Sequence, residues 1–188
     1  MITSLAQQLR DAERERVQTF NKQNFDWLML LQSHFTHAIT LTFNPSKIRR
    51  LVNRESFTNI NSKSMQLELQ QKAFGCFVKR LDKLLYGNSS ARFGQRLLLI
   101  PVMHGLYEGG KLHYHCAVGV PEDRFEVLGK KVIEAWQHTP LAGHQVDFKP
   151  YRDSGWLEYI NKETKYINRE NIDWINVRVP ATLSSTVE

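Results

Sequence analysis

The chain has 188 residues, of which 41% are hydrophobic, and its 25 Lys and Arg against 19 Asp and Glu give a formal net charge of +6 at pH 7. This length fits one domain with a core, and the hydrophobic content excludes an intrinsically disordered chain. Two cysteines exclude a disulfide framework and a Cys-rich zinc module, and no apolar run is long enough to cross a membrane. The polar N-terminus predicts no signal segment, so we expect a reduced, cytoplasmic protein, and its basic charge favours a polyanionic partner.

The apolar periodicity predicts a mixture of helices and strands. In chain order we expect a long helix over the first thirty-odd residues, a strand at 37–43, a helix around 67–85, strands at 96–104 and 111–120, a helix at 122–138, a strand at 144–150 and a last helix at 154–170. Asn44-Pro45 is expected to end the first strand and open a polar loop. The mixture predicts an α+β fold, an antiparallel sheet with helices packed on its faces. We expect a helical extension at 1–35 packed on the core, the domain at 36–180 and a tail at 181–188.

The stretch "KLHYHCAVGVP", residues 111–121, places two histidines on either side of one tyrosine. Its β-preferring residues and its Gly-Val-Pro end favour a strand. Alternate side chains of a strand share one face, so His113 and His115 can bind a single cation, whereas a helix would point them about 200° apart. Taken alone, the pair is equally consistent with two polar side chains on the face of a sheet.

A third histidine lies on the preceding strand. Gly109-Gly110 predicts a two-residue hairpin turn, and that register places His104 directly opposite His115. Any register of the same parity brings the three imidazoles to one face, although Pro101, which indicates an edge strand or a bulge, could shift it. On ligand type alone, three imidazoles suit zinc, cobalt, nickel or manganese and do not favour magnesium.

The last predicted helix carries a tyrosine and a lysine on the face opposite its apolar stripe. The stripe consists of Leu157, Ile160, Thr164 and Ile167. A nucleophilic tyrosine needs a nearby cation, and Lys162 lies one turn from Tyr159. Tyr166 has Arg169 in the same relation, but lysine can release a proton at usable pH and arginine cannot, which favours Tyr159. The alternative is an exposed Tyr–Lys pair on a solvated face.

The segments "AITLTF", "HYH" and "YINK" follow one another in an order and at a separation that resemble the HUH endonucleases, and within them the single-tyrosine rolling-circle replication initiator (Rep) proteins. The resemblance runs from residue 37 to about 166. It implies that His113 and His115 bind a divalent ion, usually magnesium or manganese, at the scissile phosphate of single-stranded DNA. It further implies that Tyr159 becomes joined to the 5′ phosphate, that Lys162 steadies charge, and that a free 3′ hydroxyl is left.

One part of the motif departs from this family. Many Rep proteins have an acidic residue in the strand before the histidine motif, where this chain reads "VMHG". We place His104 as the third ligand, as in the three-histidine sites of relaxases. Glu163 on the tyrosine helix and Glu108 at the turn are the alternatives, in that order.

The resemblance also implies the partners. They are single-stranded DNA at a replication origin or element end, possibly a hairpin, in a bacterial or phage-encoded context, and no membrane. The chain has no GxxxxGK[ST] motif, so unwinding is expected to come from a separate helicase or from supercoiling. A separate polymerase is expected to extend the free 3′ hydroxyl. Basic and aromatic residues suited to binding unpaired bases are Lys47, Arg49, Arg50, Lys149, Arg152, Trp156, Lys165, Tyr166 and Arg169.

Two other functions remain open from the sequence. A single-tyrosine transposase would share the fold, metal and nucleophile, and would differ in acting on a transposon end. A non-catalytic basic nucleic-acid-binding module would carry the HYH motif incidentally, and its Tyr159→Phe variant would behave as the wild type.

Overall fold

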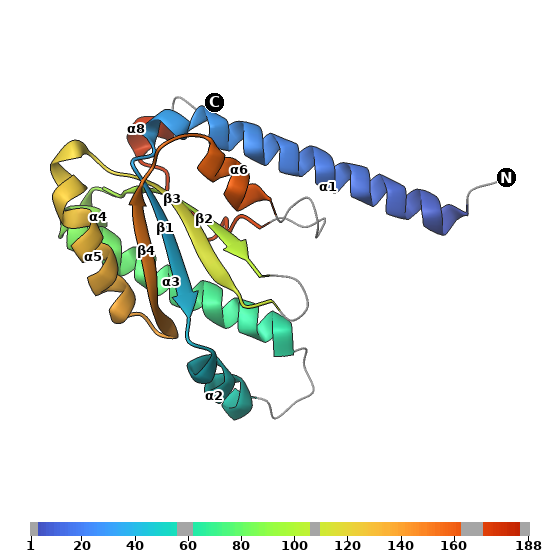
Figure 1. Ribbon diagram of the computed structural model, residues 1–188, viewed down its shortest axis with the longest axis horizontal. Coiled ribbons are helices and arrows are strands. Elements are labelled where there is room, and N and C mark those ends of the chain that lie inside the picture. Colours follow the sequence, from blue (N-terminus) through green and yellow to red (C-terminus); the bar gives the residue numbers. More distant parts are fainter. Residues whose placement is uncertain (1–3, 56–61, 106–109, 163–170, 185–188) are drawn as a thin grey trace.

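The computed structural model describes residues 4–55, 62–105, 110–162 and 171–184 and has an α+β architecture (Figure 1). Its longer elements are α1 (Leu5–Leu30), β1 (His37–Phe43), α2 (Pro45–Glu55), α3 (Ser62–Tyr86), β2 (Leu98–His104), β3 (His113–Gly119), α5 (Phe125–Gln137), β4 (Ala142–Pro150) and α6 (Gly155–Asn161), with short helices α4 (Ser89–Arg92) and α8 (Ala181–Ser184). The four strands form an antiparallel sheet in the order β2-β3-β1-β4. The predicted α+β fold, with a long N-terminal helix, is therefore confirmed.

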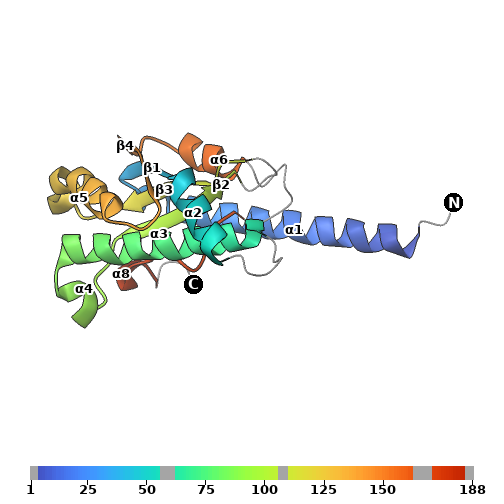
Figure 2. The same cartoon turned by 90° about the horizontal axis from the view of Figure 1, so that it is seen from below.

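The sheet separates two apolar clusters, because successive side chains of each strand point to opposite faces of the sheet. One face packs Leu41 and Tyr114 against Phe74 of α3 and Trp136 of α5. The other face joins β2 and β3 to α6 and to the end of α1. Figure 2 shows α3 and α6 on opposite sides of the sheet. The histidines of β3 lie on the α6 face.

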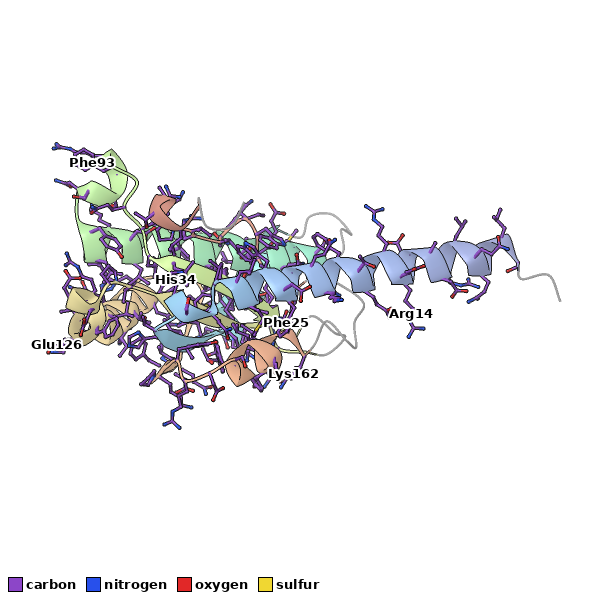
Figure 3. All side chains as sticks on the ribbon, turned by 90° about the horizontal axis from the view of Figure 1, so that it is seen from above. Arg14, Phe25, His34, Phe93, Glu126 and Lys162 are labelled. Carbon is purple, nitrogen blue, oxygen red and sulfur yellow. The ribbon has the colours of Figure 1, made fainter. Side chains whose placement is uncertain are left out.

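Helix α1 extends well beyond the rest of the protein. The side chain of Ser4 caps its first turn by accepting from the Gln7 amide. Leu28 and Leu31 are fully buried, whereas nearly all side chains of its first half are exposed, and Arg14 lies on this projecting part (Figure 3). The predicted packing of the helix end, with a solvated first half, is therefore confirmed.

The loop predicted after the first strand begins instead as a helix, α2. The Asn44 Oδ1 accepts hydrogen bonds from the amides of Ser46 and Lys47, and Ile48 and Val52 bury the inner face of the helix. Asn-Pro predicts the end of a strand, but asparagine is also a preferred N-cap and proline is favoured at the first helical position. The same two residues both end β1 and start α2.

The predicted register between the histidine strands was wrong by two residues. In the structure His104 pairs with His113, and Val102 pairs with His115. A two-residue turn at Gly109-Gly110 would require pairing to continue beyond His104, but Gly105 already leaves the strand with a φ of +80°. A Cβ on Gly105 would lie 2.3 Å from the Lys111 carbonyl oxygen, so this close crossing requires glycine.

Pro101 predicted either an edge strand or a bulge, and it lies in the edge strand β2. Strand β2 pairs with β3 from Leu98 to His104 in one unbroken register, so no bulge forms at the proline. On its outer edge the Pro101 carbonyl accepts from the Asp173 amide, and Leu99 exchanges backbone hydrogen bonds with Arg178. The C-terminal segment thus covers the edge of β2, which the sequence had not predicted.

Two further expectations concern the length of the last helix and the absence of a membrane-spanning segment. The last helix was predicted to reach residue 170; its described part is α6, which ends at Asn161, and residues 163–170 lie outside the described residues. Among the described helices none is both long and apolar enough to cross a bilayer.

Candidate metal centre

Three histidines from the two adjoining strands meet at one end of the sheet. Potential ligand atoms of His104, His113 and His115 all lie within 4.8 Å of one another. They come together because β2 and β3 are antiparallel and the three positions share one parity, so the predicted convergence survives the two-residue correction of the register. Within the described ranges, no other group of His, Cys, Asp or Glu side chains could hold a metal ion in this way.

Each imidazole has its second nitrogen held by another group. His113 Nδ1 donates to the Lys111 carbonyl at 2.9 Å, and His104 Nε2 donates to the Ile160 carbonyl at 2.6 Å. His115 Nδ1 is 2.8 Å from the Thr40 hydroxyl on β1. Because a carbonyl can only accept, these bonds leave lone pairs on Nε2 of His113 and Nδ1 of His104. Metal-ligating histidines are ordinarily oriented in this manner.

The spacing of the nitrogens fits an ion. His113 Nε2 and His115 Nε2 are 3.1 Å apart. Two nitrogens bound to one cation at about 2.1 Å, with an angle between about 90° and 110°, lie roughly 3.0–3.4 Å from each other. His113 and His115 therefore already have the spacing of two ligands of one ion, and His104, whose ligand atom lies within 4.8 Å of theirs, could complete a three-histidine site.

The electrostatic environment keeps His115 neutral. Burial, followed by the neighbouring His104, His113 and Lys162, lowers the pKa of His115 from 6.5 to about 3. A histidine must be deprotonated to bind a metal, so this environment favours the ligand form across the physiological pH range. His104 is buried with it, whereas His113 is partly exposed.

Tyr159 lies against this cluster. Its ring centroid is 5.2 Å from that of His115 and 6.0 Å from that of His104. Helix α6 aims the tyrosine there because Leu157 and Ile160 are fully buried on its inner face, which leaves Tyr159 42% exposed on the other. The predicted division of this helix into a core face and a tyrosine face therefore holds over its described part.

The Tyr159 ring is contacted by the residues one turn before and one turn after it, Trp156 and Lys162. The indole of Trp156 stacks on it, with centroids 5.4 Å apart, and also meets the His115 ring edge-on. The Lys162 ammonium lies over the Tyr159 ring, 3.9 Å from its centroid. The lysine therefore sits beside the tyrosine, as the i,i+3 spacing predicted, but against the ring face.

The predicted DNA contacts fall in three places. Lys47, Arg49 and Arg50 are exposed on α2, which begins three residues after Thr42, the β1 partner of His113. Lys149 is exposed on β4 and forms an ion pair with Asp147 at 2.8 Å, and Arg152 is exposed just before α6. Lys165, Tyr166 and Arg169 lie outside the described residues, as do the alternative ligands Glu163 and Glu108.

Sequence reasoning missed the groups that support the histidine strand. Tyr114, the middle residue of the HYH motif, donates to Asp173 Oδ2 at 2.7 Å on the opposite face of the sheet. Asp173 also accepts from Gln71 and Asn176, so this buried carboxylate has three donors. Thr40 could have been found from its strand parity with the histidines, but no local pattern points to Asp173.

Comparison with known proteins adds no relative to this picture. No family model matches the chain, and no curated protein or solved structure matches it.

Proposed function

We propose that this protein is a metal-dependent enzyme of the HUH type that nicks and rejoins single-stranded DNA through a phosphotyrosine intermediate, and that it initiates rolling-circle replication of a plasmid, phage or other mobile element. The observation that carries the proposal is the contact of the Tyr159 ring with His115 and His104. A candidate nucleophile and a candidate metal centre from distant parts of the chain adjoin each other, as this chemistry requires.

The three histidines would hold the divalent ion. Manganese and magnesium are proposed from the resemblance to HUH enzymes, and the all-imidazole ligand set favours manganese of the two, with zinc, cobalt and nickel as further candidates. When bound, the ion would polarise the scissile phosphate and draw charge from its oxygens.

Tyr159 would supply the nucleophile. Its phenolic oxygen forms a bond to the scissile phosphorus as the bond from phosphorus to the 3′ oxygen breaks. The phenol loses its proton and the departing oxygen gains one, which leaves a free 3′ hydroxyl and a 5′-phosphotyrosine with no net oxidation. Attack by a 3′ hydroxyl on the phosphotyrosine reverses the step and joins two ends. Lys162, beside the ring, would stabilise negative charge on the phosphate or the phenolate.

Basic side chains on α2 and just before α6 suit a polyanion. Arg49 and Arg50 are exposed on α2, which follows the end of β1 that pairs with His113, and Lys47 of the same helix donates to the Ala142 carbonyl at 3.4 Å. A strand of DNA running from α2 across the histidines to α6 would meet these cations on one side and Arg152 on the other. A separate helicase and polymerase would unwind and copy the duplex.

The test is direct capture of the intermediate. The protein is incubated with Mn²⁺ and a pool of single-stranded oligonucleotides, including hairpins, and analysed by mass spectrometry for a tyrosine-linked nucleotide. An adduct on Tyr159 supports the proposal, and its absence with every oligonucleotide, while binding persists, favours a non-catalytic binding module. Adducts formed only with transposon ends would favour a transposase.

A further inference from the structure

The carbonyl of Ile160 connects the histidine cluster to the tyrosine helix. The last four carbonyls of a helix have no partner within it. At the end of α6, the Ile160 carbonyl accepts from His104 Nε2 at 2.6 Å and from Asn171 Nδ2 at 3.1 Å. A candidate metal ligand and an asparagine from the C-terminal segment thus complete the end of the helix that carries Tyr159.

The direction of the first hydrogen bond decides what a cation would do to it. His104 Nε2 must carry the proton because its partner is a carbonyl, so a cation would bind at Nδ1. A cation on one ring nitrogen makes the N–H on the other a stronger donor. The bond to Ile160 is then stronger in the loaded protein, and by reciprocity the same bond favours binding of the ion.

Asn171 holds the same carbonyl from the other side. Its own carbonyl accepts from the Met103 amide at 2.7 Å, and Ile172 pairs with Val102, so the edge of β2 fixes its position. Asn171 is 1% exposed, and its Oδ1 has no hydrogen-bond partner among the described residues. Within that part of the chain, the bond to Ile160 is the only hydrogen bond of its side-chain amide.

We infer that the Ile160 carbonyl couples metal binding to the placement of α6, and that Asn171 is a positioning residue that keeps this carbonyl in reach of His104. The consequence for Tyr159, the residue immediately before Ile160, rests on the proposed function. Loading the cluster would then restrain the tyrosine helix further, so that Tyr159 is held more firmly when the ion is present than when it is absent.

The experiment compares the wild type with Asn171→Ala and Asn171→Leu. The leucine variant keeps the volume and removes both the donor and the unpaired Oδ1, so it guards against a loss of folding. Thr139→Ala is the matched control, because Thr139 is also buried and donates to a helix carbonyl, that of Ala135 in α5. Each protein is titrated with Co²⁺, followed by calorimetry and by the absorption spectrum of the bound ion.

Hydrogen exchange of the α6 amides, with and without Co²⁺, gives the second readout. We expect Co²⁺ to slow exchange in α6 of the wild type and of Thr139→Ala. Both Asn171 variants should bind Co²⁺ at least about tenfold more weakly, with a changed spectrum and with less protection of α6. The inference would be overturned, and the proposed function left standing, if both Asn171 variants had wild-type Co²⁺ affinity and spectrum. The same holds if Co²⁺ did not change the exchange of the α6 amides in the wild type. Failure of the wild type to bind any Co²⁺ would instead remove the metal centre and the proposed function with it.

Discussion

The rings of Tyr159 and His115 meet at an interplanar angle of 72°, with their centroids 5.2 Å apart. Tyr159 belongs to the short helix α6 and His115 to strand β3, so the contact depends on how α6 packs on β2 and β3. Buried Leu157 and Ile160 secure that packing.

The nucleophile is predicted to be Tyr159 and not Tyr166. Tyr166 lies outside the described residues. On the helix that the sequence predicts over residues 154–170, it would follow Tyr159 by two turns, or roughly 10 Å, so only one of the two phenols could reach a fixed phosphate at the histidine cluster. Tyr159→Phe should eliminate the covalent protein–DNA adduct seen by mass spectrometry, whereas Tyr166→Phe should retain it. An adduct that survives in Tyr159→Phe and is lost in Tyr166→Phe would reverse the assignment.

Replacing His113 and His115 with Ala should abolish Mn²⁺ binding and Mn²⁺-dependent cleavage. The fold should persist, because the core on the other face of β3 is built from Tyr114, Cys116 and Val118. Calorimetry measures the binding, and a cooperative thermal transition shows that the variant is folded. The claim fails if the folded double variant binds Mn²⁺ with wild-type affinity.

His104 is predicted to be the third ligand, through Nδ1. Its Nε2 is occupied by the Ile160 carbonyl, so only Nδ1 is left to approach the ion. A crystal structure grown with Mn²⁺ or Zn²⁺ should place this nitrogen roughly 2.0–2.3 Å from the metal. A carboxylate of Glu163 or Glu108 in that position, with His104 beyond bonding distance, would contradict the prediction.

The metal-free protein is predicted to lose stability in acid through His115. Its pKa is lowered to about 3 in the folded protein, against 6.5 in the unfolded chain. Below pH 6.5 the unfolded chain therefore binds a proton that the folded protein does not, so the free energy of unfolding falls by up to about 1.4 kcal/mol per pH unit down to about pH 3. Above pH 6.5 this group has no effect.

Asp82 acts in the opposite sense over part of this range. Burial raises its pKa from 3.8 to about 6, so its contribution to stability is lost as pH rises between those values. The His115 effect is therefore measured as the difference between the urea unfolding curves of the wild type and His115→Gln, both with EDTA. As pH falls from 6.5 to 4, the free energy of unfolding of the wild type should fall relative to that of His115→Gln. A difference that does not change with pH would show that His115 is not held neutral by the fold.

Local sequence patterns were sufficient for the histidine strand and the core face of the tyrosine helix. A strand of "HYHCAVG" alternates its side chains whatever lies around it, so His113 and His115 had to share a face. The same parity argument brought His104 to that face even though the register was two residues off. Asn44-Pro45 shows the limit of such reasoning, since one dipeptide both ended β1 and started α2.

Apart from α2, sequence alone determined the alternation of helices and strands, and it also determined the shared face of the histidines and the position of Tyr159 on the exposed side of its helix. Each of these follows from periodicities of two or 3.6 residues, which act within a single segment. The tertiary structure decided the pairing of His104 with His113 and the contact of Tyr159 with His115. It also decided the hydrogen bond between Thr40 and His115 and the two that the Ile160 carbonyl accepts. These join residues far apart in the chain, and their geometry depends on how the sheet, α6 and the C-terminal segment pack together, which no local pattern encodes.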